Sequence, residues 1–170
     1  MPSKRKLTYP FLPKSTAALV PGHFWALPLS DGSFGCARVM DLKPPGIIGA
    51  RSLFLAAVLE WHAQVAPTSE AIAEAKCLDQ GQVHLKAITQ SGGCILGHRA
   101  LELDHIEPWE FRGAEHHPNS FVYKGLQPVR PQEPADTRLP VLSAWGFLVA
   151  VQVAERRFIR GSQAGPRVFA

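Results

Sequence analysis

The chain contains a stretch that favours a tight antiparallel hairpin, His23-Phe24-Trp25-Ala26-Leu27-Pro28-Leu29-Ser30-Asp31-Gly32-Ser33-Phe34-Gly35-Cys36-Ala37-Arg38-Val39-Met40. Aromatic and aliphatic residues fill both halves. Between them, Asp31-Gly32 supplies the left-handed backbone geometry that a tight turn requires. Pro28 cannot donate a ladder hydrogen bond, so it belongs at an edge or a bulge. The pattern therefore predicts two antiparallel strands over residues 22–40.

Further elements are expected after the chain-breaking sequence Pro44-Pro45-Gly46. The continuous apolar run over 52–61 predicts a buried strand on which the hairpin closes. A capping threonine, an early acid and several alanines predict a short helix over 68–77. Alternating polar and apolar residues predict a half-buried strand over 82–87. Another strand can open at 94–96.

The C-terminal half is less regular until its end. Residues 99–138 are expected to be rich in loops, and the prolines of 128–140 predict a surface connector. Residues 142–158 contain no proline and end in cations, which favours a C-terminal helix. The predicted fold class is α+β and β-rich, with an antiparallel sheet or an SH3-like partial barrel, a short helix and the C-terminal helix.

The length of 170 residues suits one domain with short extensions. We expect a basic, proline-containing leader over 1–18, a single domain over 19–160 and a flexible tail over 161–170. The net charge of +4 comes from the ends, because residues 1–14 and 156–170 each carry +4 while 15–155 carry −4. Basic ends can bind phosphate backbones, but they are more commonly solvated, so a nucleic-acid partner is not the first expectation.

Cysteine content and hydropathy indicate the cellular compartment. The three cysteines form no Cys-x-x-Cys pair and leave one unmatched, which argues against a disulfide framework and favours the cytoplasm. The longest apolar stretches, near 53–59 and 139–154, are too short or too interrupted to span a bilayer. The N-terminus lacks the apolar core of a signal peptide. No membrane association is expected.

The sequence offers few groups for metal or cofactor chemistry. Residues 115–117 (Glu-His-His) form the densest set of possible ligands, and Cys94 with His98 is the nearest pair at helical spacing. Neither supplies the four ligands that zinc prefers, and no glycine fingerprint is present, so no metal or cofactor is expected. Cys36 could be a nucleophile activated by Arg38, although a buried cysteine acting as a small apolar residue is the favoured interpretation.

Acidic residues gather around aromatic side chains between 102 and 115. The segment contains Glu102, Asp104, Glu107, Glu110 and Glu115 beside Trp109 and Phe111, with Arg112 as its single basic residue. These acids could form a solvated loop with its aromatic residues turned inward, a surface that docks on a basic protein, or a general acid and base pair. As the docking surface we select Glu102, Asp104, Glu107, Trp109 and Glu110.

The hairpin region resembles the opening of the immunity protein 26 family over residues 20–39. That opening has a glycine, an apolar strand ending in proline, an Asp-Gly turn, an aromatic residue, a glycine and an arginine-aliphatic pair. The matching residues here are Gly22, Pro28, Asp31-Gly32, Phe34, Gly35 and Arg38-Val39. The resemblance implies a bacterial immunity protein that binds and neutralises a toxin in the cytoplasm and has no catalytic residues of its own.

Three functions therefore compete. The first is an immunity protein whose partner is a cognate toxin encoded nearby. The second is a small SH3-like β-barrel that binds nucleic acid through the basic ends of the chain. The third is an enzyme without a recognisable motif, which would use the carboxylates of 102–115 or the histidines. We favour the first, which predicts that the chain is not an enzyme.

Overall fold

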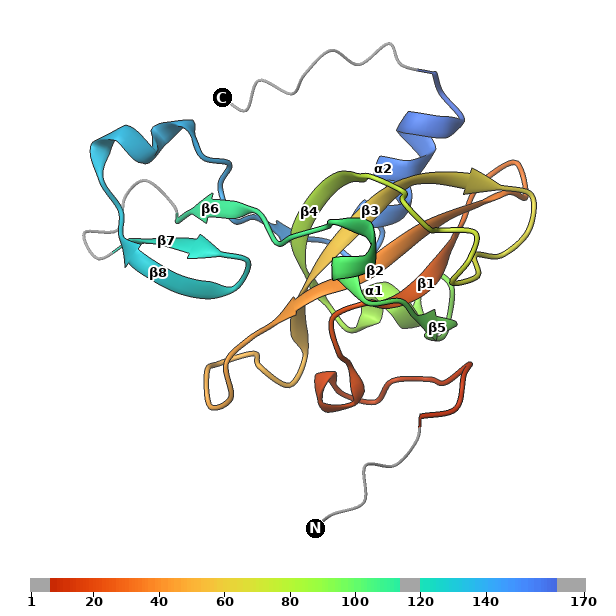
Figure 1. Cartoon of the computed structure of the whole chain (residues 1–170), viewed down its shortest axis with the longest axis horizontal. Coiled ribbons are helices and arrows are strands. Elements are labelled where there is room, and N and C mark those ends of the chain that lie inside the picture. Colours follow the sequence, from red (N-terminus) through yellow and green to blue (C-terminus); the bar gives the residue numbers. More distant parts are fainter. Residues whose placement is uncertain (1–6, 114–119, 162–170) are drawn as a thin grey trace.

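The Asp-Gly hairpin predicted over residues 22–40 is present and begins the larger of two sheets (Figure 1). A computed structural model describes residues 7–113 and 120–161. β1 (His23–Pro28) pairs antiparallel with β2 (Phe34–Leu42). In the turn between them Gly32 has a φ of +84°, and the Asp31 carboxylate accepts a hydrogen bond of 2.9 Å from the Ser33 N–H.

The larger sheet has six strands in the order β5-β1-β2-β3-β4-β9. The other four are β3 (Leu53–Ala63), β4 (Cys77–His84), β5 (Gly97–His98) and β9 (Ala144–Trp145). Neighbouring strands are antiparallel except β4 and β9, which are parallel. The sheet is open, and its edges are β5 and β9. The prediction of a β-rich α+β fold with an antiparallel sheet is confirmed, as is the strand expected over 52–61.

Both faces of this sheet are buried, which explains the uninterrupted apolar run in β3. Residues 54–59 are completely buried, and alternate residues of the run enter two separate core clusters. One cluster contains Phe54, Ala56 and Val58, and the other contains Leu55, Ala57 and Leu59. A strand covered on both faces leaves no alternate position for a polar side chain.

Helices cover one of these faces. α2 (Val149–Phe158) packs Ala150 and Ala154 into the cluster that contains Phe54, and α1 (Lys86–Thr89) adds Ile88 to it. The other face is covered by turns, by the short helix η2 and by the second sheet. The 3-10 helices are η1 (Thr16–Ala18), η2 (Leu101–Asp104) and η3 (Pro134–Arg138).

The second sheet has three antiparallel strands in the order β6-β7-β8, and it lies to the left of the larger sheet in Figure 1. Its strands are β6 (Glu110–Arg112), β7 (Phe121–Lys124) and β8 (Gln127–Pro131). Asp41 of β2 connects the two sheets, because its carboxylate accepts hydrogen bonds from the Leu126 N–H at 2.8 Å and the Gln127 amide at 3.3 Å. Gly125 lies against Asp41 with a φ of +62°, where a side chain would collide with the carboxylate.

The helix predicted over 68–77 is wrong. These residues form successive turns, and Cys77 already belongs to β4. Thr68 does accept a hydrogen bond from the Ala71 N–H, as a capping residue would. However, Glu74 has a φ of 60° and donates its N–H to Asp104 instead of to the preceding turn. That tertiary hydrogen bond outweighs the local helix preference of the alanines.

Two other boundaries also differ from the prediction. The helix expected over 142–158 begins at Val149, because Ala144 and Trp145 form β9 beside β4. The Gln82 N–H donates to the Ser143 carbonyl at 3.1 Å. Pairing with β4 therefore holds this segment in an extended conformation. The strand expected over 82–87 ends at His84 and is followed by α1. At 94–96, Ile95 forms an isolated bridge with Phe11.

The loop-rich segment expected over 99–138 contains the second sheet, and the connector expected over 128–140 contains β8 and η3. Prolines are tolerated in β8 because it is an edge strand. Its outer side therefore needs no ladder donors. Proline is excluded from a central strand, but it is compatible with an edge strand such as β8.

The domain boundary expected at Leu19 is not present in the structure, because residues before Leu19 also contact the rest of the fold. Phe11 exchanges backbone hydrogen bonds of 3.0 and 2.9 Å with Ile95, and the Thr16 N–H donates to the Arg51 carbonyl at 3.0 Å. The structured part of the chain therefore begins before Leu19. The basic residues Lys4–Lys6 and the tail expected over 161–170, apart from Gly161, lie outside the described residues.

His23 is a fully buried ionisable group at the start of β1. The Val20 N–H donates to its Nδ1 at 3.1 Å, so Nε2 carries the proton and donates to the Tyr9 hydroxyl at 2.9 Å. Burial, together with the nearby His98, lowers the pKa of His23 to about 4. The neutral ring is therefore part of the native structure.

We expect the free energy of unfolding to fall as the pH is lowered from 6.5 to 4. The unfolded chain takes up a proton on His23 near pH 6.5, whereas the folded chain does so near pH 4. The linked loss reaches ~3 kcal/mol. Urea unfolding across this range measures it. The variant His23→Asn keeps an acceptor for the Val20 N–H and cannot be protonated, so it should lack this component; an unchanged pH dependence in the variant would contradict the assignment.

Candidate functional site

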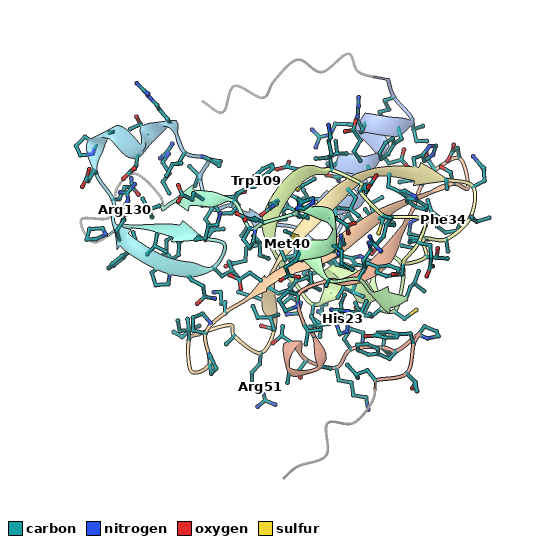
Figure 2. The ribbon with its side chains drawn as sticks, in the orientation of Figure 1. His23, Phe34, Met40, Arg51, Trp109 and Arg130 are labelled. Carbon is teal, nitrogen blue, oxygen red and sulfur yellow. The ribbon has the colours of Figure 1, made fainter. Side chains whose placement is uncertain are left out.

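A cleft of about 600 Å³ opens beside Trp109, where the chain passes from the larger sheet to the three-stranded sheet (Figure 2). Its lining residues are His105, Glu107, Pro108, Trp109, Glu110, Lys124, Leu139 and Pro140. Of the residues selected from the sequence, the cleft brings together Glu107, Trp109 and Glu110. Glu102 is exposed on η2 and does not line it. Asp104 is buried elsewhere.

The backbone beneath the cleft is held by Gln80, a buried residue of β4. The Gln80 side-chain amide donates to the Glu107 carbonyl at 2.9 Å and accepts from the Trp109 N–H at 2.9 Å. The oxygen and the nitrogen of the Gln80 amide therefore both bind the backbone of one short loop. The Trp109 carbonyl in turn accepts a hydrogen bond of 2.8 Å from the Gly125 N–H in the second sheet. These contacts fix the loop between the two sheets.

Polar and apolar side chains both line the cleft, and the apolar ones are Pro108, Trp109, Leu139 and Pro140. Trp109 is partly buried and packs against the core cluster that contains Phe111, with their ring centroids 6.4 Å apart. Leu139 and Pro140 form a wall that Arg112 holds in place, since it donates its Nε to the Leu139 carbonyl at 3.0 Å and its N–H to the Pro140 carbonyl at 2.9 Å. Trp109 is therefore only partly buried and contributes to the lining of the cleft.

Charged groups lie on the rim of the cleft. The Glu107 side chain is 78% exposed and forms an ion pair of 3.2 Å with Lys124. Glu110 is exposed and lies directly opposite Lys124 in the β6–β7 register. An exposed ion pair of this kind contributes less than ~1 kcal/mol, so these charges remain available to a partner.

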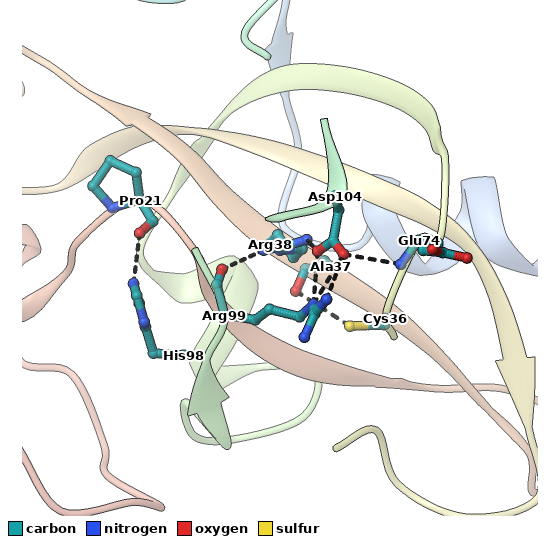
Figure 3. Close-up of polar contacts among 8 residues, drawn as sticks. All are labelled: Pro21, Cys36, Ala37, Arg38, Glu74, His98, Arg99 and Asp104. Atoms are coloured by element: carbon teal, nitrogen blue, oxygen red, sulfur yellow. Dashed lines mark hydrogen bonds and ion pairs between the residues drawn. The ribbon is translucent and has the colours of Figure 1, made fainter. Parts of the chain in front are cut away.

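Asp104 is not a docking residue, which corrects the selection made from the sequence. Its side chain is completely buried and lies 2.7 Å from Arg38 and 2.9 Å from Arg99 (Figure 3). The Glu74 N–H also donates to it at 2.9 Å. Burial by itself raises the pKa of Asp104, but the hydrogen bonds from Arg99, Glu74 and Arg38 outweigh it and hold the pKa at about 2. Asp104 is therefore an ionised structural group.

Two features were not predicted from the sequence: the role of Gln80 and the pairing of Arg38 with Asp104. Arg38 is completely buried in β2 and also donates to the Arg99 carbonyl. A lone arginine within an apolar strand signals a buried acid elsewhere in the chain. Gln80 within β4 carries the same kind of signal, because a buried amide needs partners on both its oxygen and its nitrogen.

Cys36 is a buried structural residue. Its thiol lies 3.6 Å from the Ala37 carbonyl, and burial raises its pKa above the usual range. Arg38, the cation expected to activate it, is bound to Asp104. Burial also raises the pKa of Cys77 to about 11. Both thiols are therefore protonated at neutral pH.

The remaining histidines and cysteines were candidates for metal binding or catalysis. Within residues 7–113 and 120–161, no three histidine, cysteine or acidic side chains converge as metal ligands. The candidate set at 115–117 lies outside the described residues, and His98 contacts the Pro21 carbonyl at 3.0 Å (Figure 3). Ser33 is fully buried and donates its hydroxyl proton to Asp31, so His62, at 2.7 Å from that hydroxyl, faces its lone pair.

Comparisons with known proteins place no further constraint on this site. No family model, curated protein or solved structure matches the chain. In the part of the chain that the structure describes, no helix has both the length and the hydropathy required to cross a bilayer.

We expect Asp104→Ala to lower the free energy of unfolding by about 3–5 kcal/mol, because it leaves Arg38 buried without its partner. The double variant Arg38→Met/Asp104→Leu removes both charges and should recover most of this loss. Glu102→Ala on the exposed side of the same 3-10 helix should change stability by less than about 0.5 kcal/mol. Urea unfolding compares the three; equal stability of Asp104→Ala and Glu102→Ala would show that the buried pair has no such role.

Proposed function

We propose that the chain is a bacterial immunity protein that binds a cognate toxin by direct contact at the cleft beside Trp109. The observation that carries the proposal is the combination of an accessible, partly buried tryptophan with exposed carboxylates on a backbone fixed by Gln80. Protein interfaces use such aromatic anchors and complementary charge. The resemblance of the hairpin to immunity proteins supports the same function. The partner is then a toxin encoded nearby, and the complex forms in the cytoplasm without a cofactor.

The environment of the carboxylates favours binding over catalysis. A pair of carboxylates acts as acid and base when the surroundings of the two groups differ, for example when one is buried in an apolar pocket. Glu107 and Glu110 are both exposed on the rim, and Glu107 is paired with Lys124. The two carboxylates therefore differ in ion pairing and not in burial. This arrangement supports a role in steering a charged partner.

The charge distribution favours a protein partner over nucleic acid. Carboxylates on the cleft rim repel phosphate groups, which nucleic-acid-binding surfaces attract with lysine and arginine. Near the C-terminal end of α2, Arg157 is paired with Glu60. The remaining basic residues of the N-terminal end, Lys4–Lys6, lie outside the described residues. The alternative of an SH3-like nucleic-acid module rests on the likeness of the hairpin to small SH3-like barrels and on the basic ends, of which Lys14, Arg156 and Arg160 are described.

The double variant Glu107→Lys/Glu110→Lys should weaken binding to the product of the neighbouring gene. We expect association to slow by about tenfold at low salt and its salt dependence to change, because these charges steer the encounter. Glu102→Lys is the control, since it makes the same type of change on an exposed residue outside the cleft. Surface plasmon resonance measures the rates, and co-expression tests protection from the toxin. Unchanged rates in the double variant would remove the cleft as the interface.

Trp109→Ala should weaken the same complex by about 2 kcal/mol or more, which corresponds to about thirtyfold, if the indole is a buried anchor. Trp61 provides a matched control, because it is also partly buried against the same core cluster but does not line the cleft. Trp61→Ala should therefore leave affinity unchanged. Circular dichroism and calorimetry establish that both variants fold. Equal loss of affinity in the two would assign Trp109 a purely structural role.

A further inference from the structure

The cleft beside Trp109 has features that select one class of side chain. The carboxylates of Glu107 and Glu110 line it together with Lys124 and His105, and Trp109, Pro108 and Pro140 contribute its apolar surface. The volume of about 600 Å³ lies within the range of sites that bind a short segment of a ligand. A cation with an apolar, planar surface matches both the rim and the interior.

Glu110 is the carboxylate that a ligand can engage most readily. Its neighbour Glu107 already forms an ion pair with Lys124, whereas no described residue forms an ion pair with Glu110. The nearby Arg130 is committed to Asp136, with contacts of 2.6 and 2.7 Å. Among the described residues, Glu107 therefore has an ion-pair partner in direct contact, whereas Glu110 has only the longer-range attraction of Arg130.

Lys124 lies between the two carboxylates. Directly opposed residues on antiparallel strands have Cβ atoms about 5 Å apart, so the ammonium group of Lys124 can reach Glu110 as well as Glu107. Its side chain is 43% exposed. It thus acts as an internal cation that an incoming cation has to displace from the rim.

On these grounds we propose that the cleft binds an arginine-bearing segment of the partner protein, with the guanidinium on the face of Trp109 and hydrogen-bonded to Glu110, and that Lys124 competes with it. This inference rests on the proposed function, of which it specifies the partner's chemistry. Arginine is preferred to lysine because its planar guanidinium stacks on an indole and pairs with a carboxylate through two parallel hydrogen bonds.

Removing the charge of Glu110 and removing that of Lys124 should change the affinity for arginine in opposite directions. Glu110→Gln should weaken arginine binding by about three- to tenfold, and Lys124→Gln should strengthen it by a similar factor, because it frees Glu107 and removes the competitor. A surface that binds an acidic partner would show the reverse response to Lys124→Gln. Glu102→Gln, outside the cleft, should have no effect.

The test uses the full chain labelled with ¹⁵N and the peptide acetyl-Gly-Gly-Arg-Arg-Gly-Gly-amide as the probe. Peptides with lysine, citrulline or glutamate in place of arginine are the comparisons, citrulline being a neutral group of nearly the same shape. The indole N–H signal of Trp109 is assigned with Trp109→Phe. We expect it to shift with the arginine peptide, less with lysine and not with citrulline. The HSQC spectrum of each variant confirms that it folds.

The outcomes separate this inference from the proposed function. The inference would be overturned if the Trp109 indole signal shifted as much with the citrulline peptide as with the arginine peptide, or more with the glutamate peptide. It would also be overturned if millimolar arginine peptide caused no shift. Weaker arginine binding by Lys124→Gln would overturn it as well. Because no toxin is present, a specific arginine response supports the inference even if the neighbouring gene product does not bind. Conversely, if that product binds at the cleft without an arginine response and Lys124→Gln does not strengthen the complex, the proposed function stands and the inference fails.

Discussion

The buried ion pair between Arg38 and Asp104 is the constraint on which the rest of the structure depends. A guanidinium at the centre of a six-stranded sheet is tolerated only when a carboxylate reaches it. Asp104 is brought there by η2, and its remaining lone pairs bind Arg99 and the Glu74 N–H. The charge of Arg38 in β2 is thus linked through Asp104 to η2, to Arg99 and to the turn that contains Glu74, all of which lie on this face of the sheet.

The candidate site follows from that path. After Asp104, the chain passes beside β4, where Gln80 binds both ends of the loop from Glu107 to Trp109. Asp41 then holds the turn between β7 and β8 against the end of β2. Because the backbone is fixed at each of these points, the exposed side chains of the cleft are presented without a large ordering cost on binding.

Local chemistry was sufficient to predict the hairpin and β3 from the sequence, because the Asp31-Gly32 turn and a run buried on both faces need no distant information. The short strands of the second sheet were not predictable in this way, since prolines and charges obscure their alternation. Of the residues selected for the candidate site, the structure brings Glu107, Trp109 and Glu110 to one cleft. Asp104 is buried instead, because it pairs with Arg38, which lies 66 residues away in the sequence. Only the folded chain shows which of several similar acids is buried.

The three-stranded sheet also has protected edges. Arg112 of β6 exchanges backbone hydrogen bonds with Pro140 and Leu142, both at 2.9 Å, so that edge is already occupied. On the opposite edge, β8 contains Pro128 and Pro131, which have no N–H groups to offer an incoming strand. Both edges are therefore less able to accept a further strand. The region that carries the cleft is in this way guarded against edge-to-edge aggregation.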